Sequence, residues 1–178
     1  MKFINIVFIG IYFLTLFNSC QDPCKSVNCE NGSCDDGKCV CDFGWTGDNC
    51  ETIRATLYKG FYEGPLSCGI GDDTIVLKVE NVGNSLTDLK MHTVGLIFNV
   101  GVAISFDDYT LTATIDSAFS GFTIDTLPVT YNISTYTING KITGSGIFNS
   151  EDEIDLTLKA LTDNPLFPEV TCTGTLKK

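Results

Sequence analysis

Six cysteines lie within residues 24–50, and this crowding constrains the fold more than any other feature of the sequence. So short a segment cannot bury enough apolar surface to fold unaided, so disulfides must take the place of a hydrophobic core. The chain has nine cysteines in 178 residues, an odd number, so at least one is not paired within the chain. This cysteine content indicates an oxidising compartment rather than the cytosol.

The spacing of these six cysteines is specific. They are separated by four, four, four, one and eight residues, and the tail from Cys39 to Cys50 reads C-V-C-D-F-G-W-T-G-D-N-C. That tail fits the pattern C-x-C-x2-G-aromatic-x-G-x2-C, and residues 24–51 therefore resemble an EGF-like module. If the connectivity of that family carries over, the disulfides are Cys24–Cys34, Cys29–Cys39 and Cys41–Cys50.

Metal binding is the competing interpretation of clustered cysteines. Zinc sites use paired C-x-x-C spacings, which this segment lacks. Calcium-binding EGF modules carry two or three acids before the first cysteine and an acid or amide directly preceding it, whereas only Asp22 stands here. Because calcium requires six to eight oxygen ligands, we expect no metal and no other cofactor.

Phe43 and Trp45 are expected to pack against the last disulfide, with a partner-binding face as the alternative.

The N-terminal residues predict export. Lys2 and the apolar run over residues 4–17 are typical of a secretory signal peptide, here residues 1–19. Ser19 precedes Cys20, and this junction resembles the lipobox of bacterial lipoproteins in the looser form of Bacteroidota, although Phe17 replaces the usual Leu. The resemblance implies that Cys20 carries acyl chains such as palmitate and that residues 20–23 are the anchor segment. An ordinary Cys20 is the alternative, but lipidation leaves eight cysteines, all of which can pair.

From Thr52 onward the sequence predicts one antiparallel β domain, residues 52–178, so the chain as a whole is mainly β. Apolar and polar residues alternate clearly in 109–115 and 154–160, as in half-buried strands. Gly140 and Gly144–Gly146 interrupt a strand pattern and predict bulges or barrel-closing bends. Eight or nine strands fit a β-barrel or a β-sandwich. The expected strands are 53–61, 74–80, 89–99, 102–106, 109–115, 130–133, 136–147, 153–161 and 170–176.

The last two cysteines, Cys68 and Cys172, are expected to pair. The bridge would enclose 105 residues (172 − 68 + 1), for which the chain-entropy model gives about 4.7 kcal/mol. The layout around Gly60, Tyr62, Gly144 and Cys172 also resembles small β domains of Bacteroidota surface lipoproteins. Most such domains have no assigned function, so this resemblance bears on fold and location rather than on activity.

Composition and motifs argue against several function classes. The formal net charge of −11 repels a polyanion, so we predict no nucleic-acid binding. His92 is the single histidine and is expected to be a surface or structural residue. Ser67 and Ser145 lack the G-x-S-x-G context of a nucleophile. Glycosidase chemistry requires two carboxylates that face each other across a cleft. The acidic groups of this chain lie mainly at predicted turns, so we expect them to be solvated loop tips and the protein not to be an enzyme. These groups are Asp72-Asp73, Asp107-Asp108, and Glu151-Asp152-Glu153 with Asp155.

Two further patterns leave alternatives open. An eight-stranded barrel could enclose a ligand as lipocalins do, but the G-x-W signature is absent and a small barrel can be filled by its own side chains. Three triplets resemble the D-S/T-apolar sequon for O-glycosylation in Bacteroidota, and turn acids that cap strand starts are an equal alternative. The triplets are Asp73-Thr74-Ile75, Asp116-Ser117-Ala118 and Asp125-Thr126-Leu127.

The function that we predict is binding rather than catalysis. The lipid at Cys20 would anchor the protein to the outer membrane, with the cell surface favoured over the periplasmic face, and the partner would be an outer-membrane protein. An accessory subunit of a transport, secretion or assembly complex is the first expectation. A surface adhesin or carbohydrate-binding lipoprotein is the alternative, followed by a lipocalin-like small-molecule binder.

Overall fold

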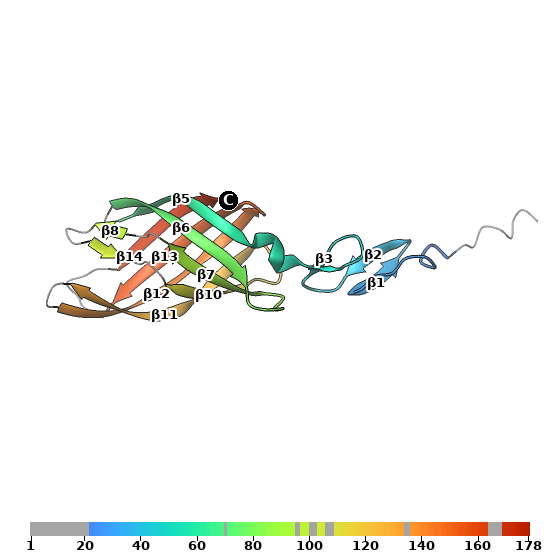
Figure 1. Ribbon diagram of the computed structural model, residues 1–178, viewed down its shortest axis with the longest axis horizontal. Coiled ribbons are helices and arrows are strands. Elements are labelled where there is room, and N and C mark those ends of the chain that lie inside the picture. Colours follow the sequence, from blue (N-terminus) through green and yellow to red (C-terminus); the bar gives the residue numbers. More distant parts are fainter. Residues whose placement is uncertain are drawn as a thin grey trace, which may run out of the picture. The chain divides into compact units, whose positions relative to one another are not determined.

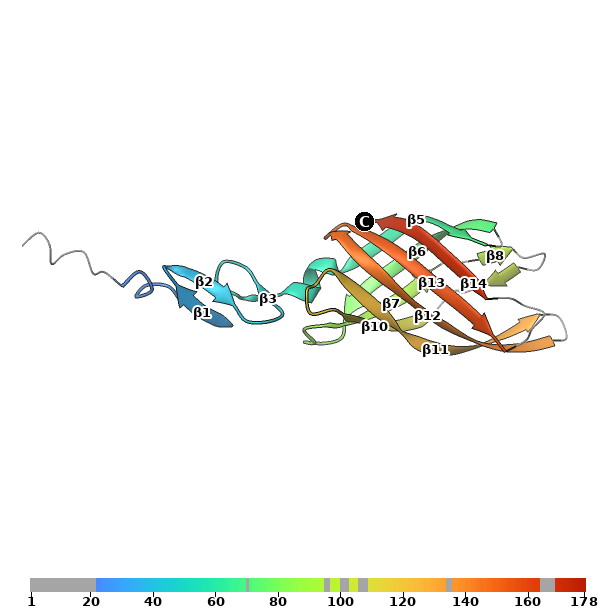
Figure 2. The ribbon, with the colours of Figure 1, turned by 180° about the vertical axis from the view of Figure 1, so that it is seen from behind.

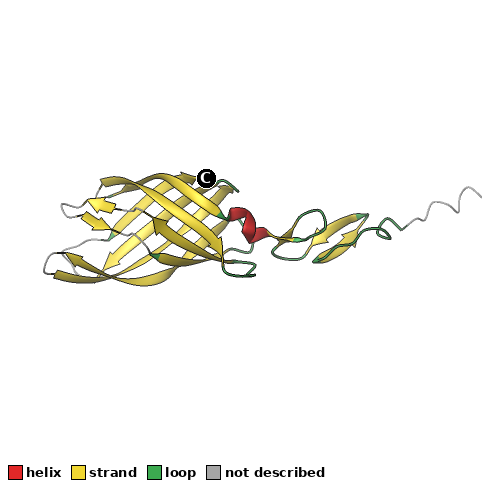
Figure 3. Ribbon diagram, in the orientation of Figure 1, coloured by secondary structure: helices red, strands yellow, loops and turns green. Residues whose placement is uncertain are grey.

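The computed structural model describes residues 22–69, 71–94, 97–99, 103–105, 109–133, 136–163 and 169–178. The chain divides into two compact units, Met1–Thr52 and Ile53–Lys178, close to the predicted boundary at residue 52 (Figure 1). The predicted signal peptide, Cys20 and the Asp107-Asp108 pair lie outside the described residues. Nearly all regular structure in the described residues is β, with one short helix among them (Figure 3).

The first unit is a small disulfide-bonded module. Strand β1 (Gly32–Asp35) pairs with β2 (Lys38–Cys41) through the turn residues Asp36 and Gly37, and β3 (Trp45–Thr46) pairs with β4 (Thr52–Ile53). Both turn residues have positive φ, 47° and 82°, as a tight hairpin requires. Sequence favours this turn because Asp and Gly tolerate the left-handed region.

The second unit is a closed antiparallel barrel in the order β10-β11-β12-β13-β14-β5-β6-β7, which decides between barrel and sandwich (Figures 1 and 2). A 3-10 helix, η1 (Arg54–Tyr58), precedes it, and β8 pairs with β9 in a separate sheet. The strands are β5 (Gly60–Cys68), β6 (Gly71–Asn81), β7 (Asp88–Val94), β8 (Ile97–Asn99), β9 (Ala103–Ser105), β10 (Thr110–Ile115), β11 (Gly121–Ile133), β12 (Tyr136–Ser150), β13 (Glu153–Thr162) and β14 (Val170–Lys177).

The barrel interior is filled by apolar side chains. On β10 the residues Leu111, Ala113 and Ile115 are buried while the threonines between them are exposed, as the alternation predicts. Among the described barrel residues, most apolar side chains point inward and most polar ones outward. The largest fully buried side chains are Tyr62, Leu66, Ile75, Leu77, Leu89, Met91, Leu111, Ile124, Ile154, Leu156 and Leu176.

The predicted strand over residues 53–61 is wrong. Residues 54–58 form η1 instead, because Thr56 Oγ1 donates to the Ile53 carbonyl at 2.6 Å and the helix buries Ala55 and Tyr58 against the end of the core. Tyr58 Oη in turn donates to the Phe119 carbonyl at 3.0 Å. The helix therefore closes one end of the barrel, and the first barrel strand begins only at Gly60.

Strand β11 begins nine residues before the predicted start at Thr130 (130 − 121). Its pairing with β10 ends at Ile124, and among the described residues its pairs from Leu127 to Ile133 are with β12. Pro128, which has no N–H, is tolerated there because a strand edge needs no donor on its open side. The bulge predicted at Gly144–Gly146 is present in part, since the β11–β12 register shifts between the pairs Ile124–Gly144 and Leu127–Ile142, whereas Gly140 pairs in regular register. A second shift lies between β12 and β13, at 148/150.

Candidate functional site

One part of the barrel wall combines exposed apolar and charged side chains. Phe61 on β5 is 61% exposed and Val94 on β7 is 47% exposed. Phe61 lies opposite Lys78 of β6, and Lys78 lies opposite His92 of β7; in the adjoining row Val76 lies opposite Val94. We call these outward side chains, together with Glu80, the Phe61 face: Phe61, Val76, Lys78, Glu80, His92 and Val94.

The charged members of the Phe61 face are linked to one another. Lys78 Nζ lies 2.8 Å from Glu80 Oε1, and His92 Nε2 lies 3.3 Å from Glu80 Oε2. His92 Nδ1 also lies 2.9 Å from Thr110 Oγ1. The hydrogen bond from Lys78 is the main cause that holds the pKa of Glu80 below its usual value. These exposed pairs add little stability, but they fix the charges in a row beside Phe61.

The backbone geometry explains why Phe61 faces outward. Tyr62 is fully buried, and successive strand residues point to opposite sides, so its neighbour must point away from the core. Lys78 Nζ lies 5.9 Å from the centre of the Phe61 ring. An exposed aromatic side chain held on a rigid strand, beside a polar rim, is the arrangement found at the centre of protein interfaces.

Other exposed apolar side chains are more isolated. Ile147 on β12 is 57% exposed, but its direct neighbours across the sheet are Gly121 and Asp155. Val40 and Phe43 of the first unit are each 54% exposed. Single exposed apolar residues are normal on protein surfaces, whereas the Phe61 face groups two exposed apolar residues, Phe61 and Val94, with the half-buried Val76 on the strand between them.

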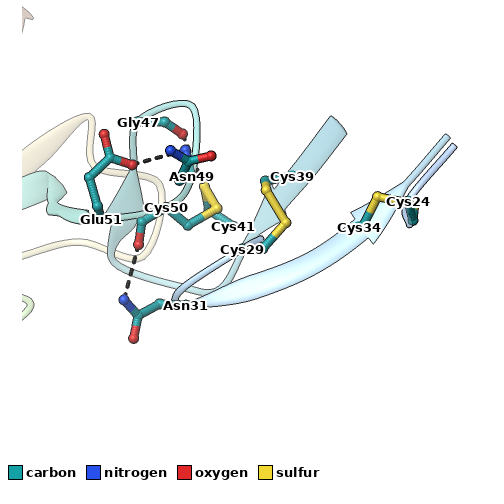
Figure 4. Close-up of a disulfide and its surroundings, with 10 residues drawn as sticks. All are labelled: Cys24, Cys29, Asn31, Cys34, Cys39, Cys41, Gly47, Asn49, Cys50 and Glu51. Atoms are coloured by element: carbon teal, nitrogen blue, oxygen red, sulfur yellow. Dashed lines mark hydrogen bonds between the residues drawn. A yellow bond between two sulfur atoms is a disulfide. The ribbon is translucent and has the colours of Figure 1, made fainter. Parts of the chain in front are cut away.

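The eight cysteines outside the predicted anchor form four disulfides. In the first unit Cys24–Cys34, Cys29–Cys39 and Cys41–Cys50 follow one another along the module (Figure 4), with Cα–Cα distances of 5.8, 5.6 and 5.2 Å. Asn31 Nδ2 donates to the Cys50 carbonyl at 3.0 Å, and Asn49 N–H donates to Glu51 Oε2 at 2.9 Å (Figure 4). These are the three pairs that the EGF-like resemblance implied, and the fourth bridge is Cys68–Cys172.

Three of the described acidic residues considered for catalysis, Asp72, Glu153 and Asp155, bind a neighbouring strand. Asp155 Oδ1 accepts from Thr175 Oγ1 at 2.6 Å, and Asp72 Oδ1 accepts from Ser67 Oγ at 2.7 Å. Glu153 pairs with Lys177 Nζ at 3.0 Å. These three residues therefore link strands on the outer wall, and the described partners of His92 are Glu80 and Thr110 instead. Ser145 is exposed on β12, opposite Thr123 and Thr157.

The triplet hydroxyls of Thr74, Ser117 and Thr126 belong to exposed residues. Two of their acids act locally: Asp73 Oδ1 accepts from the Thr74 N–H at 2.7 Å, and Asp116 Oδ1 accepts from the Ala118 N–H at 2.9 Å. The third, Asp125, instead accepts from Thr112 Oγ1 at 2.8 Å. The capping interpretation thus has a geometric basis, while modification of the triplets stays a prediction.

Within the described ranges, no group of three or more His, Cys, Asp or Glu side chains is placed to hold a metal ion. The same described residues form no helix of a length and hydrophobicity that would cross a membrane.

Sequence reasoning missed the Phe61 face. The predicted strand 53–61 ended at Phe61 and left its direction open, whereas the observed strand runs through it. The adjacent aromatic residues Phe61 and Tyr62 could have revealed it. Only one of two successive strand residues can point into the core, so the other must be exposed.

No family model matches the chain, and no curated protein matches it. A solved structure, that of EF1p2_mFAP2b bound to DFHBI, is similar at 14% sequence identity with a TM-score of 0.44, covering 70% of this chain and 95% of that chain. A likeness at this level carries no argument about function, and the resemblances to EGF-like modules and to lipoproteins stay predictions.

Proposed function

We propose that this protein is a lipid-anchored binding protein that acts as an accessory subunit of an outer-membrane complex. The observation that carries the proposal is the Phe61 face, which groups exposed Phe61 and Val94 with a fixed row of charges on rigid strands. Fully buried side chains such as Leu77, Met91 and Leu156 occupy the barrel interior, which favours binding through the outer surface over a lipocalin-like cavity.

The rest of the chain fits this role. In the proposal Cys20 carries the lipid, and the first disulfide-bonded cysteine follows after only three residues, so the anchor leads directly into a folded module. That module resists unfolding and proteolysis through three bridges rather than a core. The barrel then presents a partner-binding wall on a scaffold with a core of its own.

The binding proposal is tested by Phe61→Ser in the full-length protein, extracted from native membranes in gentle detergent. A co-purifying outer-membrane protein is expected with the wild type, and its recovery should fall about tenfold or more with Phe61→Ser, as for the loss of an aromatic anchor. Ile147→Ser is the matched control, because Ile147 is an equally exposed strand residue outside the face. A wild-type protein that elutes alone, or equal losses in both variants, would count against the proposal.

The anchor is tested separately by Cys20→Ser. The variant should move from the membrane fraction to the soluble fraction while its four disulfides stay intact by mass spectrometry. Membrane association that survives the substitution would contradict lipid anchoring at Cys20.

A further inference from the structure

The barrel consists of two half-sheets that meet at two seams, pairings with few register pairs. Strands β5, β6, β7 and β10 form one half-sheet and β11 to β14 form the other. Within the halves, neighbouring strands share between five and eleven register pairs. The two pairings between the halves, β10–β11 and β14–β5, share three each. Each half is also continuous in sequence, residues 60–115 and 121–177.

The β10–β11 seam is a hinge, because the chain itself connects its strands. The connecting turn is held by Asp116, whose Oδ1 accepts the N–H groups of Ala118 and Ser120 at 2.9 and 3.0 Å. Phe119 adopts a φ of 56° in this turn and packs into the core. The two halves therefore stay attached here whatever happens at the other seam.

The β5–β14 seam lacks pairs in its middle. Its register pairs are Cys172 with Cys68, Thr173 with Ser67 and Lys177 with Glu63, with none between. Pro65 supplies no N–H in the gap. The backbones nevertheless approach closely there, since a Cβ on Gly174 would lie 2.0 Å from the Pro65 carbonyl oxygen.

Specific contacts lie at the two ends of this seam: a lysine side chain at one end and a disulfide at the other. At one end Lys178 Nζ donates to the Leu57 carbonyl at 2.9 Å and lies 3.4 Å from Asp152 Oδ1. At the other end the Cys68–Cys172 disulfide joins directly opposed residues of the two strands. It is the covalent link of the seam, and Cys68 is partly exposed whereas Cys172 is buried.

We propose that Cys68–Cys172 is a redox-controlled clasp, and that its reduction by a dithiol opens the barrel along β5–β14 about the Asp116 turn. A thiolate of the dithiol attacks Sγ of the partly exposed Cys68, and Cys172 leaves as a thiolate that takes a proton from water. The second thiol of the reductant then resolves the mixed disulfide and releases Cys68, so that one disulfide is reduced and one dithiol is oxidised. Opening frees the edges of β5 and β14 to pair with another strand.

Hydrogen exchange of the barrel amides tests the clasp. Dithiothreitol is added to the folded full-length protein, and alkylation with mass mapping establishes that Cys68 and Cys172 are reduced. Exchange in peptides from β5 and β14 should then accelerate about tenfold or more, while peptides from β12 and β13 stay protected, as expected for sub-global opening. Unchanged exchange at the seam after reduction, or an equal loss of protection in every strand, would overturn the proposal.

The control is the double variant Cys68→Ser and Cys172→Ser. Without reductant its seam peptides should exchange as fast as those of the reduced wild type, and dithiothreitol should add nothing further. That second result separates the clasp from the three bridges of the first unit, which the reagent also reduces. A double variant that loses protection throughout the barrel would contradict opening at a single seam.

Discussion

Because Gly146 has no side chain, the ring of Phe122 can occupy the space beside it. Phe122 lies directly opposite Gly146 across β11 and β12, and its ring covers the space where a side chain would stand. The same ring lies 5.1 Å from that of Phe148, which stacks on Tyr58 at 3.7 Å between ring centres. The glycine thus lets an aromatic cluster form beneath η1, at the end of the barrel that the helix closes.

Gly146→Ala is therefore expected to destabilise the barrel. Its Cβ would lie 2.3 Å from Cζ of Phe122, so the ring must leave its place in the cluster. We expect a loss of about 1–3 kcal/mol in the free energy of unfolding, the usual cost of overpacking, measured by urea denaturation. Gly69→Ala is the control, because nothing lies within 4 Å of its added Cβ. Equal stability of the two variants would refute the packing argument.

Tyr62 is a second residue whose role depends on burial. Its hydroxyl is placed to donate to the carbonyls of Tyr58 and Glu151, at 3.0 and 2.9 Å. Burial, aided by the charge of Asp152, raises the pKa of the Tyr62 phenol well above its ordinary value. The folded protein therefore holds this proton to higher pH than the unfolded chain does.

Alkaline titration should reveal that difference. Above pH ~10 the unfolded chain loses the Tyr62 proton first, so the free energy of unfolding should fall by up to about 1.4 kcal/mol per pH unit. Below that pH the shift has no effect. Tyr62→Phe should be about 1 kcal/mol less stable at neutral pH through the lost hydrogen bond, yet show a shallower decline between pH 9 and 11. The measurement is urea denaturation across that range, and parallel declines would disprove the assignment.

Among the elements, those with strong alternation were predictable and those set by tertiary contacts were not. Strands β10 and β13 follow directly from alternating residues such as Leu111 and Leu156, because each has one buried face. The helix η1 was missed because its apolar residues suit a strand equally well, and only packing of Tyr58 over the barrel end selects the helix. The first part of β11 was missed because it contains Pro128 and a bulge.

The turn between β10 and β11 also depends on one side chain. Hydrogen bonds to the carboxylate, first that from the Ser120 backbone, hold the pKa of Asp116 below its usual value. Asp116→Ala should lower the free energy of unfolding by about 1 kcal/mol, as loss of such local bonds does, and Asp116→Asn should cost less because it keeps one acceptor. Thermal unfolding checks both, with exposed Asp163→Ala as the control. An Asp116→Ala variant as stable as the control would show that the turn does not need this residue.

For the whole molecule, the sequence left barrel and sandwich open for a physical reason. Closure depends on pairing residue 63 with residue 177, and no local pattern encodes a contact between residues so far apart. Cysteine parity pointed to a Cys68–Cys172 bridge but not to the strand pairing around it.

The division into two units predicts that the barrel folds alone. A fragment of residues 53–178 contains the core cluster and its own disulfide. It should give a β-type circular dichroism spectrum and a single cooperative thermal transition, within a few degrees of the barrel transition in the full-length protein. A fragment without a cooperative transition would show that the barrel needs the first unit.

The four disulfides also differ in when they can form. Those of the first unit join cysteines nine or ten positions apart, whereas Cys68 and Cys172 are 104 positions apart. In a chain that is exported N-terminus first, as proposed, the first unit can be complete while the barrel strands are still arriving. Contacts between distant residues form slowly, and β14 is the last strand of the chain. If the proposed export takes place, maturation would end with a single oxidation event, and until then the eight-stranded sheet would be an unclosed meander whose strands must be kept from pairing with other chains.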